Sequence, residues 1–308
     1  MAFNLRKLCV SCRDIESCID FCVVHKLLPS KESNKCIDCG AEGKVVWQKR
    51  SKNKNVPYCL KCSSCHKESA IAVKTWFERT KLTVAQSLTL IYLWQLHIKI
   101  FDAAIEAEVS ANTVVDYYRF YREVCYVIIT NSQREIGGVG HVVEVDESHL
   151  FVRKYNRGRL TKHEKEHIWI FGGIDRDTKQ CFALRVNRRN KETLCSLIKN
   201  FILPGTKICT DGWKSYKDLE KEGYLHGIVN HSVEFINSED SRVCTQTVER
   251  MWGTLKSEVK RKGRESEHDD LYMFEFLYRQ MQRRNGQSEA GAIFLNFLED
   301  IGKVYPGR

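Results

Sequence analysis

The sequence contains little proline and no long apolar run. Only 4 of its 308 residues are Pro, while hydrophobic residues make up 43% and aromatic residues 10%. This composition argues against a disordered chain and allows a sizeable buried core. The longest apolar stretches fall far short of the ~20 residues that a membrane-spanning helix needs, so we expect no membrane partner. A chain of this length predicts two or three domains.

The first residues also lack a long apolar segment and a small-residue cleavage site, so we expect an intracellular chain with reduced thiols. The sequence nevertheless has 14 Cys, and nine of them lie within the first 65 residues. Clustered cysteines in a reducing compartment are typical of metal ligands rather than of a disulfide framework.

Two cysteine pairs have the spacing of metal-binding turns. Cys36 and Cys39 form one C-x-x-C pair, and either Cys59 with Cys62 or Cys62 with Cys65 forms the other. Each such turn directs two thiolates at one ion, and a tetrahedral zinc ion needs two turns. The intervening residues suffice for a short hairpin, so we predict a zinc ribbon. A set of unliganded thiols is the alternative.

Positive charge is concentrated near this ribbon. The formal net charge is +10, and residues 31–81 contain 12 Lys and Arg against five acidic residues, a net of +7. A polyanionic partner is therefore plausible, although a basic solvated surface would have the same composition.

Residues 83–128 have helical periodicity without Pro or Gly. Within them, residues 103–115 indicate a helix, a tight turn and a second helix that Ser110 or Asn112 can cap. This pattern suits a recognition helix in a DNA major groove, but an ordinary helical hairpin has the same pattern. The candidate DNA-binding side chains on the second helix are Asn112, Thr113, Arg119 and Arg122.

From about residue 140 the pattern changes to short β-rich runs, and helical periodicity returns near residues 193–201 and again after Thr245. Strands that alternate with helices predict an α/β domain. We therefore expect four segments: an N-terminal helical segment (1–30), a zinc-ribbon module (31–82), a helix-turn-helix-like region (83–136) and an α/β domain (137–308).

Three acidic residues occupy positions that suit magnesium binding. Asp146 and Asp211 each end an apolar strand, and Glu249 lies early in a helix whose apolar stripe would pack on the sheet. Carboxylates are hard oxygen ligands, and three of them can gather two magnesium ions for phosphodiester chemistry. A turn-forming Asp or a solvated Glu would occupy the same positions. The competing acidic residues are Glu144, Glu147, Asp175, Asp177 and Asp240.

From about residue 30 to residue 285 the chain resembles a DDE transposase of the Merlin superfamily, which is related to bacterial insertion-sequence transposases. The matching motifs, in order, are VEVDES (143–148), WIFGGIDR (169–176), CTDGW (209–213), NHSVEF (230–235) and TQTVERMWGTLK (245–256). The resemblance implies an RNase H-like catalytic core, in which a mixed sheet is flanked by helices. It also implies that Asp146, Asp211 and Glu249 are the catalytic, metal-binding triad.

The resemblance further favours Cys62 and Cys65 over Cys59 as the second pair, with one structural Zn²⁺ held by Cys36, Cys39, Cys62 and Cys65. It implies two Mg²⁺ or Mn²⁺ ions at the catalytic site. We expect the enzyme to bind the terminal inverted repeats of a mobile element, to hydrolyse the phosphodiester at its ends and to join the freed 3′-hydroxyls to target DNA. The phosphate backbone would be held by Lys256, Lys260, Arg261 and Lys262.

Synapsis of two ends suggests a homodimer or a larger assembly, and the basic run at residues 260–262 suggests residence in a nucleus. A domesticated, sequence-specific DNA-binding factor without transposition activity is the alternative function. A metal-dependent nuclease that cuts without rejoining is a third.

Overall fold

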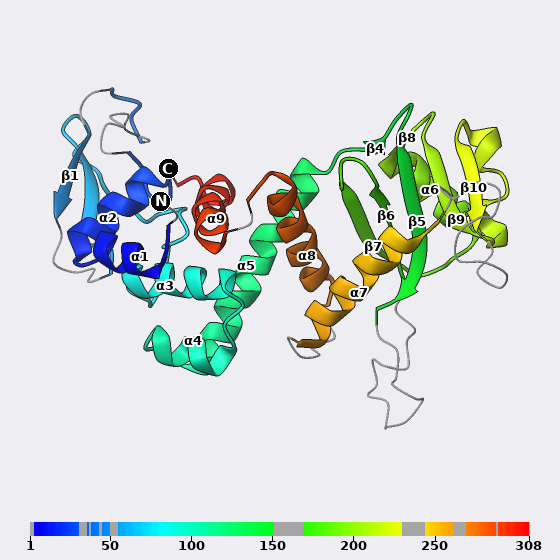
Figure 1. Cartoon of the computed structure of the whole chain (residues 1–308). Helices are drawn as coiled ribbons and strands as arrows, with labels where there is room; N and C mark the ends of the chain where they lie inside the picture. The colour runs from blue at the N-terminus through cyan, green and yellow to red at the C-terminus, as the bar shows by residue number, and fades with distance from the viewer. Residues whose placement is uncertain are drawn as a thin grey trace. The chain divides into compact units, whose positions relative to one another are not determined.

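The computed structural model describes residues 3–30, 36, 38–42, 45–49, 55–150, 169–229, 244–261, 269–287 and 289–307 (Figure 1). The chain divides into two compact units, Met1–Ile128 together with Gln287–Arg308, and Ile129–Gly286. The division falls within one long helix, and the domain boundaries expected from the sequence remain a prediction. No described helix combines the length and the apolar character that crossing a membrane requires.

The first unit begins with two short helices, α1 (Leu5–Ser11) and α2 (Ile15–Val24), within the N-terminal segment that the sequence predicted to be helical. The break has a local cause. The Asp14 side chain accepts the backbone N–H of Ser17 and caps α2, and an extended Asp14 cannot continue the helix before it. Asn4 caps α1 in the same way through the N–H of Lys7.

A small antiparallel sheet follows, in the order β1 (Val45–Lys49), β2 (Tyr58–Cys62) and β3 (Glu68–Ala70). The hairpin between the two cysteine pairs is thus confirmed, because β1 pairs with β2 so that Val45 lies opposite Cys62. Cys62, the last residue of β2, therefore lies beside the start of β1. The first pair, Cys36 and Cys39, precedes β1 in the chain, so both pairs are at the same end of the hairpin.

The rest of the first unit is helical, as the periodicity of residues 83–128 predicted. It contains α3 (Val84–Gln95), α4 (Ile100–Glu106), the beginning of α5 (Ala111–Ser132) and α9 (Ala290–Val304). Thr83 and Gln86 form a capping box at the start of α3. The core is aromatic, since the ring of Phe297 lies 4.8 Å from that of Trp94 and 5.9 Å from that of Tyr121, centroid to centroid.

The second unit is built on a five-stranded mixed sheet with the order β10-β9-β5-β6-β7. The strands are β5 (Val142–His149), β6 (Trp169–Asp175), β7 (Cys181–Val186), β9 (Lys207–Asp211) and β10 (Leu225–Val229). Strands β5, β6 and β7 form an antiparallel meander, whereas β9 and β10 run parallel to β5. The α/β class is confirmed, and β10 is the strand of this sheet that the sequence reading missed.

Helices cover both faces of this sheet. The buried face of α6 (Lys191–Phe201) packs with Val143, Val145 and Phe171 in one core cluster. Because side chains alternate along a strand, Glu144 and Asp146 point to the opposite face. On that face α7 (Gln246–Arg261) packs against β5 and β6, and α8 (Asp269–Arg284) packs against α7 and β7 (Figure 1). A two-stranded sheet of β4 (Ile136–Gly137) and β8 (Ile202–Leu203), and two 3₁₀ turns, η2 (Lys214–Tyr216) and η3 (Leu219–Glu222), complete the unit.

Candidate functional site

Two of the three predicted acids lie on neighbouring strands. Strands β5 and β9 pair in parallel with Glu144 opposite Cys209, and continuing this register by two residues places Asp146 of β5 beside Asp211 at the end of β9. Adjacent strands are about 4.8 Å apart, and residues in register point to the same face. The two carboxylates therefore converge at the end of β9, on the face that α7 covers.

The environment of Asp146 disfavours its negative charge. Burial and the neighbouring charges of Glu147 and Asp211 raise the pKa of the Asp146 carboxyl to about 7. The indole N–H of Trp252 donates to Oδ2 of Asp146 at 3.1 Å and partly opposes this shift. A half-buried carboxyl surrounded by like charges is a favourable ligand for a cation, because a bound cation offsets the repulsion.

Glu249 lies in the first turns of α7 and is exposed. Its Oε1 accepts a hydrogen bond from the Thr245 hydroxyl at 3.0 Å. Trp252 lies three residues further along the same helix, and residues at this spacing share a helix face, so Glu249 is on the side of α7 that meets Asp146. Among the described residues, however, the three acids do not form a group of ligand atoms within 4.8 Å of one another.

The acid Glu144 fixes the position of α7. This fully buried residue of β5 accepts the backbone N–H groups of Thr247 and Val248 at 2.7 and 2.9 Å through Oε2. Its Oε1 accepts from Nε of Arg176 at 2.6 Å, and Nη2 of Arg176 donates to the carbonyl of Cys244 at 2.6 Å. A carboxylate from the strand therefore caps the helix, where it also meets the positive end of the helix dipole.

The predicted apolar stripe of α7 is confirmed, because Val248, Trp252, Leu255 and Val259 are all buried. Trp252 lies directly against β6 at a glycine. A Cβ added at Gly172 would meet the Trp252 ring at 2.7 Å and the carbonyl oxygen of Phe182 at 2.4 Å. Only a glycine at this position allows the indole to reach Asp146.

Two further groups flank the acids. Lys256 of α7 donates from Nζ to the Ser148 hydroxyl at 2.6 Å and so lies beside the end of β5. The guanidinium of Arg189 stacks on two indoles, 3.3 Å from the ring centroid of Trp169 and 5.1 Å from that of Trp213. Trp213 is 45% exposed and comes two residues after Asp211, so this cation and its aromatic platform face solvent next to the acids.

The remaining acidic residues that were alternatives to the predicted triad are Glu147, Asp175, Asp177 and Asp240. Asp175 is buried, accepts the backbone N–H groups of Asp177 and Thr178, and receives Nδ1 of His141 at 2.9 Å on its other oxygen. These contacts stabilise the β6–β7 turn. His141, Asp175 and Asp177 also form a group of potential ligand atoms within 4.8 Å of one another. Burial raises the pKa of Glu147, and Asp240 lies outside the described residues.

The cysteine cluster consists of the two pairs that the resemblance favoured. The sulfur atoms of Cys36, Cys39, Cys62 and Cys65 all lie within 4.8 Å of one another, and Cys59 is not among them. The Cys36–Cys65 and Cys39–Cys62 sulfur pairs are each 3.7 Å apart. Four sulfurs at about 2.3 Å from a tetrahedral zinc ion would be about 3.8 Å apart, so the donor set and its spacing fit zinc.

Backbone N–H groups favour the thiolate form of Cys62 in this cluster. The N–H of Cys65 donates to the Cys62 sulfur and contributes most to lowering the pKa of that thiol to about 6. The thiolate is the form that binds a metal ion.

The region predicted to be helix-turn-helix-like contains α4, a turn and α5. Ser110 caps α5, because its hydroxyl accepts the backbone N–H of Thr113 at 3.1 Å, which confirms one of the two predicted caps. Asn112 is exposed, and Arg119 is partly exposed beside Glu123 at 3.5 Å. Arg122 differs from the exposed position expected for it: its side chain is only 6% exposed, because it lies on the face of α5 that carries Tyr118 and Cys125 into the core.

Of the basic residues expected to hold the phosphate backbone after Glu249, the structure describes the side chain of Lys256 alone. Lys256 is described above. Lys260 and Arg261 lie in the last turn of α7, with their side chains outside the described part of the structure, and Lys262 lies outside the described residues altogether. The NHSVEF motif is outside them as well.

Residues 138–280, which fall within the second unit, match the family model of the ISXO2-like transposase domain. This match supports a DDE transposase domain of the insertion-sequence type over these residues.

Solved structures with limited similarity include two viral proteins. The chain is 13% identical to a chain of the simian T-cell lymphotropic virus intasome in complex with the PP2A regulatory subunit B56 gamma, covering 60% of this chain and 67% of that one at a TM-score of 0.29. It is 15% identical to the HTLV-2 integrase catalytic core domain in complex with magnesium, covering 47% and 86% at a TM-score of 0.29. The comparison with curated proteins found no match.

Proposed function

We propose that the chain is a DNA transposase of the Merlin type, with an RNase H-like core that cleaves transposon ends and joins them to target DNA. The observation that carries this proposal is the convergence of Asp146 and Asp211 on adjacent strands beneath α7, the helix of Glu249. The strand order, with an antiparallel meander followed by two parallel strands, supports the proposed core. The transposase-domain match over residues 138–280 supports the reaction class.

Asp146, Asp211 and Glu249 would hold two Mg²⁺ or Mn²⁺ ions. Divalent ions in such a site activate a water or hydroxyl nucleophile and stabilise the leaving oxygen of a phosphodiester. The chain's own residues prepare the acids for this task. Trp252 holds the Asp146 carboxylate in one orientation through its N–H, and Glu144 and Arg176 fix the N-terminus of α7 against β5.

Other residues would bind the substrate. Lys256, beside Ser148 at the end of β5, suits a phosphate next to the reacting one. Arg189 and the exposed Trp213 offer a cation and an aromatic face, which suit a phosphate and a stacked base. The four-cysteine cluster would hold one structural zinc ion, and Asn112, Thr113 and Arg119 would contact the terminal repeats. Buried Arg122 is left out of this set.

The test is a cleavage and strand-transfer assay on DNA that carries the inverted repeats flanking the gene. Wild-type protein with Mg²⁺ or Mn²⁺ should nick the repeat ends and join them to a target plasmid, and the Asp146→Ala variant should bind the same DNA without either reaction. A domesticated DNA-binding factor would bind without cleaving, and a simple nuclease would cleave without joining. Equal activity of wild type and Asp146→Ala would show that the catalytic assignment is wrong.

A further inference from the structure

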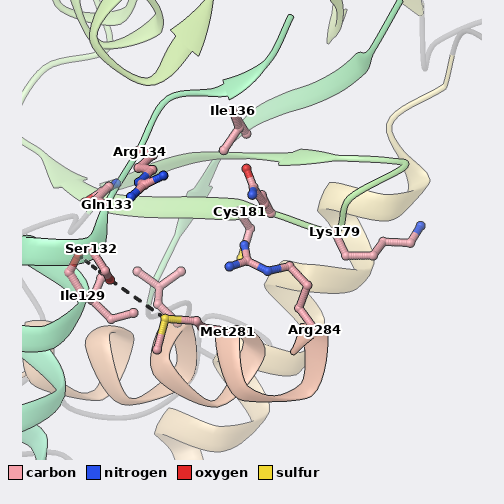
Figure 2. Close-up of a pocket in the computed structure, with 11 residues that line it drawn as sticks. Ile129, Ser132, Gln133, Arg134, Ile136, Lys179, Cys181, Met281 and Arg284 are labelled. Carbon is pink, nitrogen blue, oxygen red and sulfur yellow. Dashed lines mark hydrogen bonds between the residues drawn. The ribbon is translucent and has the colours of Figure 1, made fainter. Parts of the chain in front are cut away.

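The second unit contains a pocket away from the acids, with a volume of about 250 Å³ (Figure 2). It is lined by the end of α5, the segment leading into β4, the β6–β7 turn, the start of β7 and the end of α8. In Figure 2, Arg284 extends from the end of α8 toward Cys181 of β7. Cys181 lies opposite Ile174, whereas Asp146 lies opposite Gly172, so the pocket is toward the β6–β7 turn and apart from the acids.

The charges around this pocket have one sign. Its lining includes Arg134, Lys179 and Arg284 and no Asp or Glu. Within the described part of the chain, none of these three cations forms an ion pair. Neutral hydrogen-bonding groups of Ser132, Gln133 and Gln180 complete the polar part of the lining.

The remaining titratable group of the lining does not offset this charge. Burial raises the pKa of the Cys181 thiol to about 12, although the nearby Arg284 acts in the opposite direction. The thiol is therefore neutral at physiological pH.

Local stability explains each cation singly, but not the presence of two guanidinium groups at one hollow; in Figure 2 Lys179 extends away from Arg134 and Arg284, at the rim of the pocket. Arg284 lies in the last turn of α8, where a cation interacts favourably with the helix dipole. Lys179 is an exposed turn residue, and Arg134 follows the end of α5. The guanidinium groups of Arg134 and Arg284 at one hollow nevertheless repel each other, and a bound anion offsets this repulsion. Two guanidinium groups also have the planar, multiple-donor geometry that suits phosphate oxygens.

We propose that this pocket binds a phosphate group of the DNA backbone, at a position separate from the reacting phosphodiester. The proposal rests on the proposed DNA function. Cys181 is two residues along the sheet and two strands across from Asp146, which corresponds to roughly 12 Å at about 3.3 Å per residue and 4.8 Å per strand. One DNA molecule can span that separation within a few nucleotides, at about 3.4 Å per nucleotide along the duplex axis.

The experiment compares two triple variants of the full chain that lose the same charge. Arg134→Gln/Lys179→Gln/Arg284→Gln empties the pocket of cations, and Lys191→Gln/Lys199→Gln/Lys221→Gln removes cations that pair with Asp218 or Glu222 elsewhere on the second unit. Affinity for a short duplex of mixed sequence is measured over a series of salt concentrations. For a single phosphate contact, the pocket variant should lose about 0.9 from the slope of log affinity against log salt, and the control variant should keep the wild-type slope.

Equal slopes for the pocket variant and wild type would overturn the proposal, as would equal losses in both triple variants, which would mean that net charge alone matters. Thermal unfolding shows whether each variant is folded. The single substitution Lys179→Gln, at an exposed turn, removes one lining cation with little risk to the fold, and its slope of log affinity against log salt is measured in the same way. Inorganic phosphate provides a second arm. If it raises the unfolding temperature of wild type but not of the pocket variant, while both bind DNA alike, the pocket takes a free phosphate and the DNA assignment is wrong.

Failure of the proposed function would be visible separately. Wild-type protein would then show no metal-dependent cleavage of repeat DNA. Failure of the pocket proposal alone would leave cleavage intact and the salt slope of the pocket variant unchanged.

Discussion

The carboxylate of Glu144 accepts the backbone N–H of Val248 at 2.9 Å, and this contact joins residues 104 positions apart in the sequence. It connects the strand of Asp146 directly to the first turn of the helix of Glu249. The predicted triad member Asp146 and its competitor Glu144 therefore have different surroundings: Glu144 positions α7, whereas Asp146 faces the space between the strand ends and that helix.

Removing the charge of Glu144 should destabilise the second unit. In Glu144→Gln, Arg176 remains largely buried without its carboxylate partner, and breaking a buried pair on one side costs roughly 3–5 kcal/mol. We expect a clear fall in the unfolding temperature. The double variant Glu144→Gln/Arg176→Met should recover part of the loss, because no unpaired buried charge remains.

The matched control for this substitution is Glu222→Gln, which removes a carboxylate from the exposed pair with Lys199. Exposed pairs contribute roughly 0–1 kcal/mol, so its unfolding temperature should stay near that of wild type. Equal shifts in Glu144→Gln and Glu222→Gln would contradict the positioning role of Glu144.

Stability without metal should fall as the pH rises from about 4 to about 7. The pKa of Asp146 is about 7 in the folded protein against a usual 3.8, so across this interval the folded state holds a proton that the unfolded state has lost. Each rise in pH then favours unfolding. Asp146→Asn should show a shallower dependence, because Glu147, whose pKa burial also raises, keeps its own contribution, and the variant should be more stable than wild type at pH values above 7. An unchanged pH dependence in Asp146→Asn, measured by thermal unfolding beside the exposed control Asp177→Asn, would contradict the assignment.

Divalent ions should shift the pH dependence of cleavage. The ionised form of Asp146 binds the cation, so protons and metal compete, and a higher Mg²⁺ concentration lowers the pH at which cleavage is half-maximal. The measurement is the cleavage rate between about pH 5.5 and 8.5 at two Mg²⁺ concentrations. If the pH of half-maximal cleavage does not change with the Mg²⁺ concentration, the group that titrates does not bind the metal, and the assignment of Asp146 as a ligand is contradicted.

Replacing the Trp252 indole by a phenyl ring should raise the pKa of Asp146 further. Trp252→Phe removes the N–H that donates to Oδ2 while keeping most of the buried ring surface. A hydrogen bond to a charged group contributes about 1.5–3 kcal/mol, or about one to two pKa units. Starting from a pKa of about 7, this lowers the ionised fraction of Asp146, and with it the cleavage rate, by about fivefold to fiftyfold near neutral pH. The diagnostic readout is partial rescue at higher pH, where Asp146 is ionised in both proteins. A loss of the same size at every pH would indicate a packing defect instead.

Zinc content should distinguish the cysteines. Freshly purified wild type should contain one zinc ion per chain, and Cys62→Ala should lose it because Cys62 is part of the four-sulfur cluster. Cys59→Ala is the control, since Cys59 is equally buried in the same strand but outside the cluster. Zinc loss in both variants, or none in either, would contradict the assigned ligand set.

Local patterns predicted much of this fold. Alternating or continuous apolar runs located β5, β6, β7 and β9, and the apolar stripe correctly oriented α7 toward the sheet. The strand β10 was missed because Leu225–Val229 is short and contains a glycine and a histidine. The spacing of the cysteines left Cys59 and Cys65 as alternative partners of Cys62. Cys59 and Cys62 lie three apart on β2 and point to opposite faces, so Cys59 cannot join Cys62 in the cluster.

Local sequence patterns could not predict the contacts that position the acids and α7. The Trp252–Asp146 and Glu144–α7 contacts depend on the rotation and depth of a helix about 100 residues away from the strand. The stacking of Arg189 between Trp169 and Trp213 joins three separate segments. One signal was available: the two glycines after Phe171 mark a close approach in an otherwise bulky strand, and Trp252 is the ring that uses it. Nuclear residence and a homodimeric or larger assembly remain predictions.

The joining step tests the central proposal most directly. Repeat-end DNA that is already cut, with either a 3′-hydroxyl or a 3′-deoxy terminus, is incubated with target plasmid, Mg²⁺ and wild-type protein or Asp211→Asn. If the protein is a transposase, only the 3′-hydroxyl end with wild-type protein yields joined product. Joined product from 3′-deoxy ends or from Asp211→Asn, or no joined product from wild type that cleaves the same repeat, would contradict the proposed function.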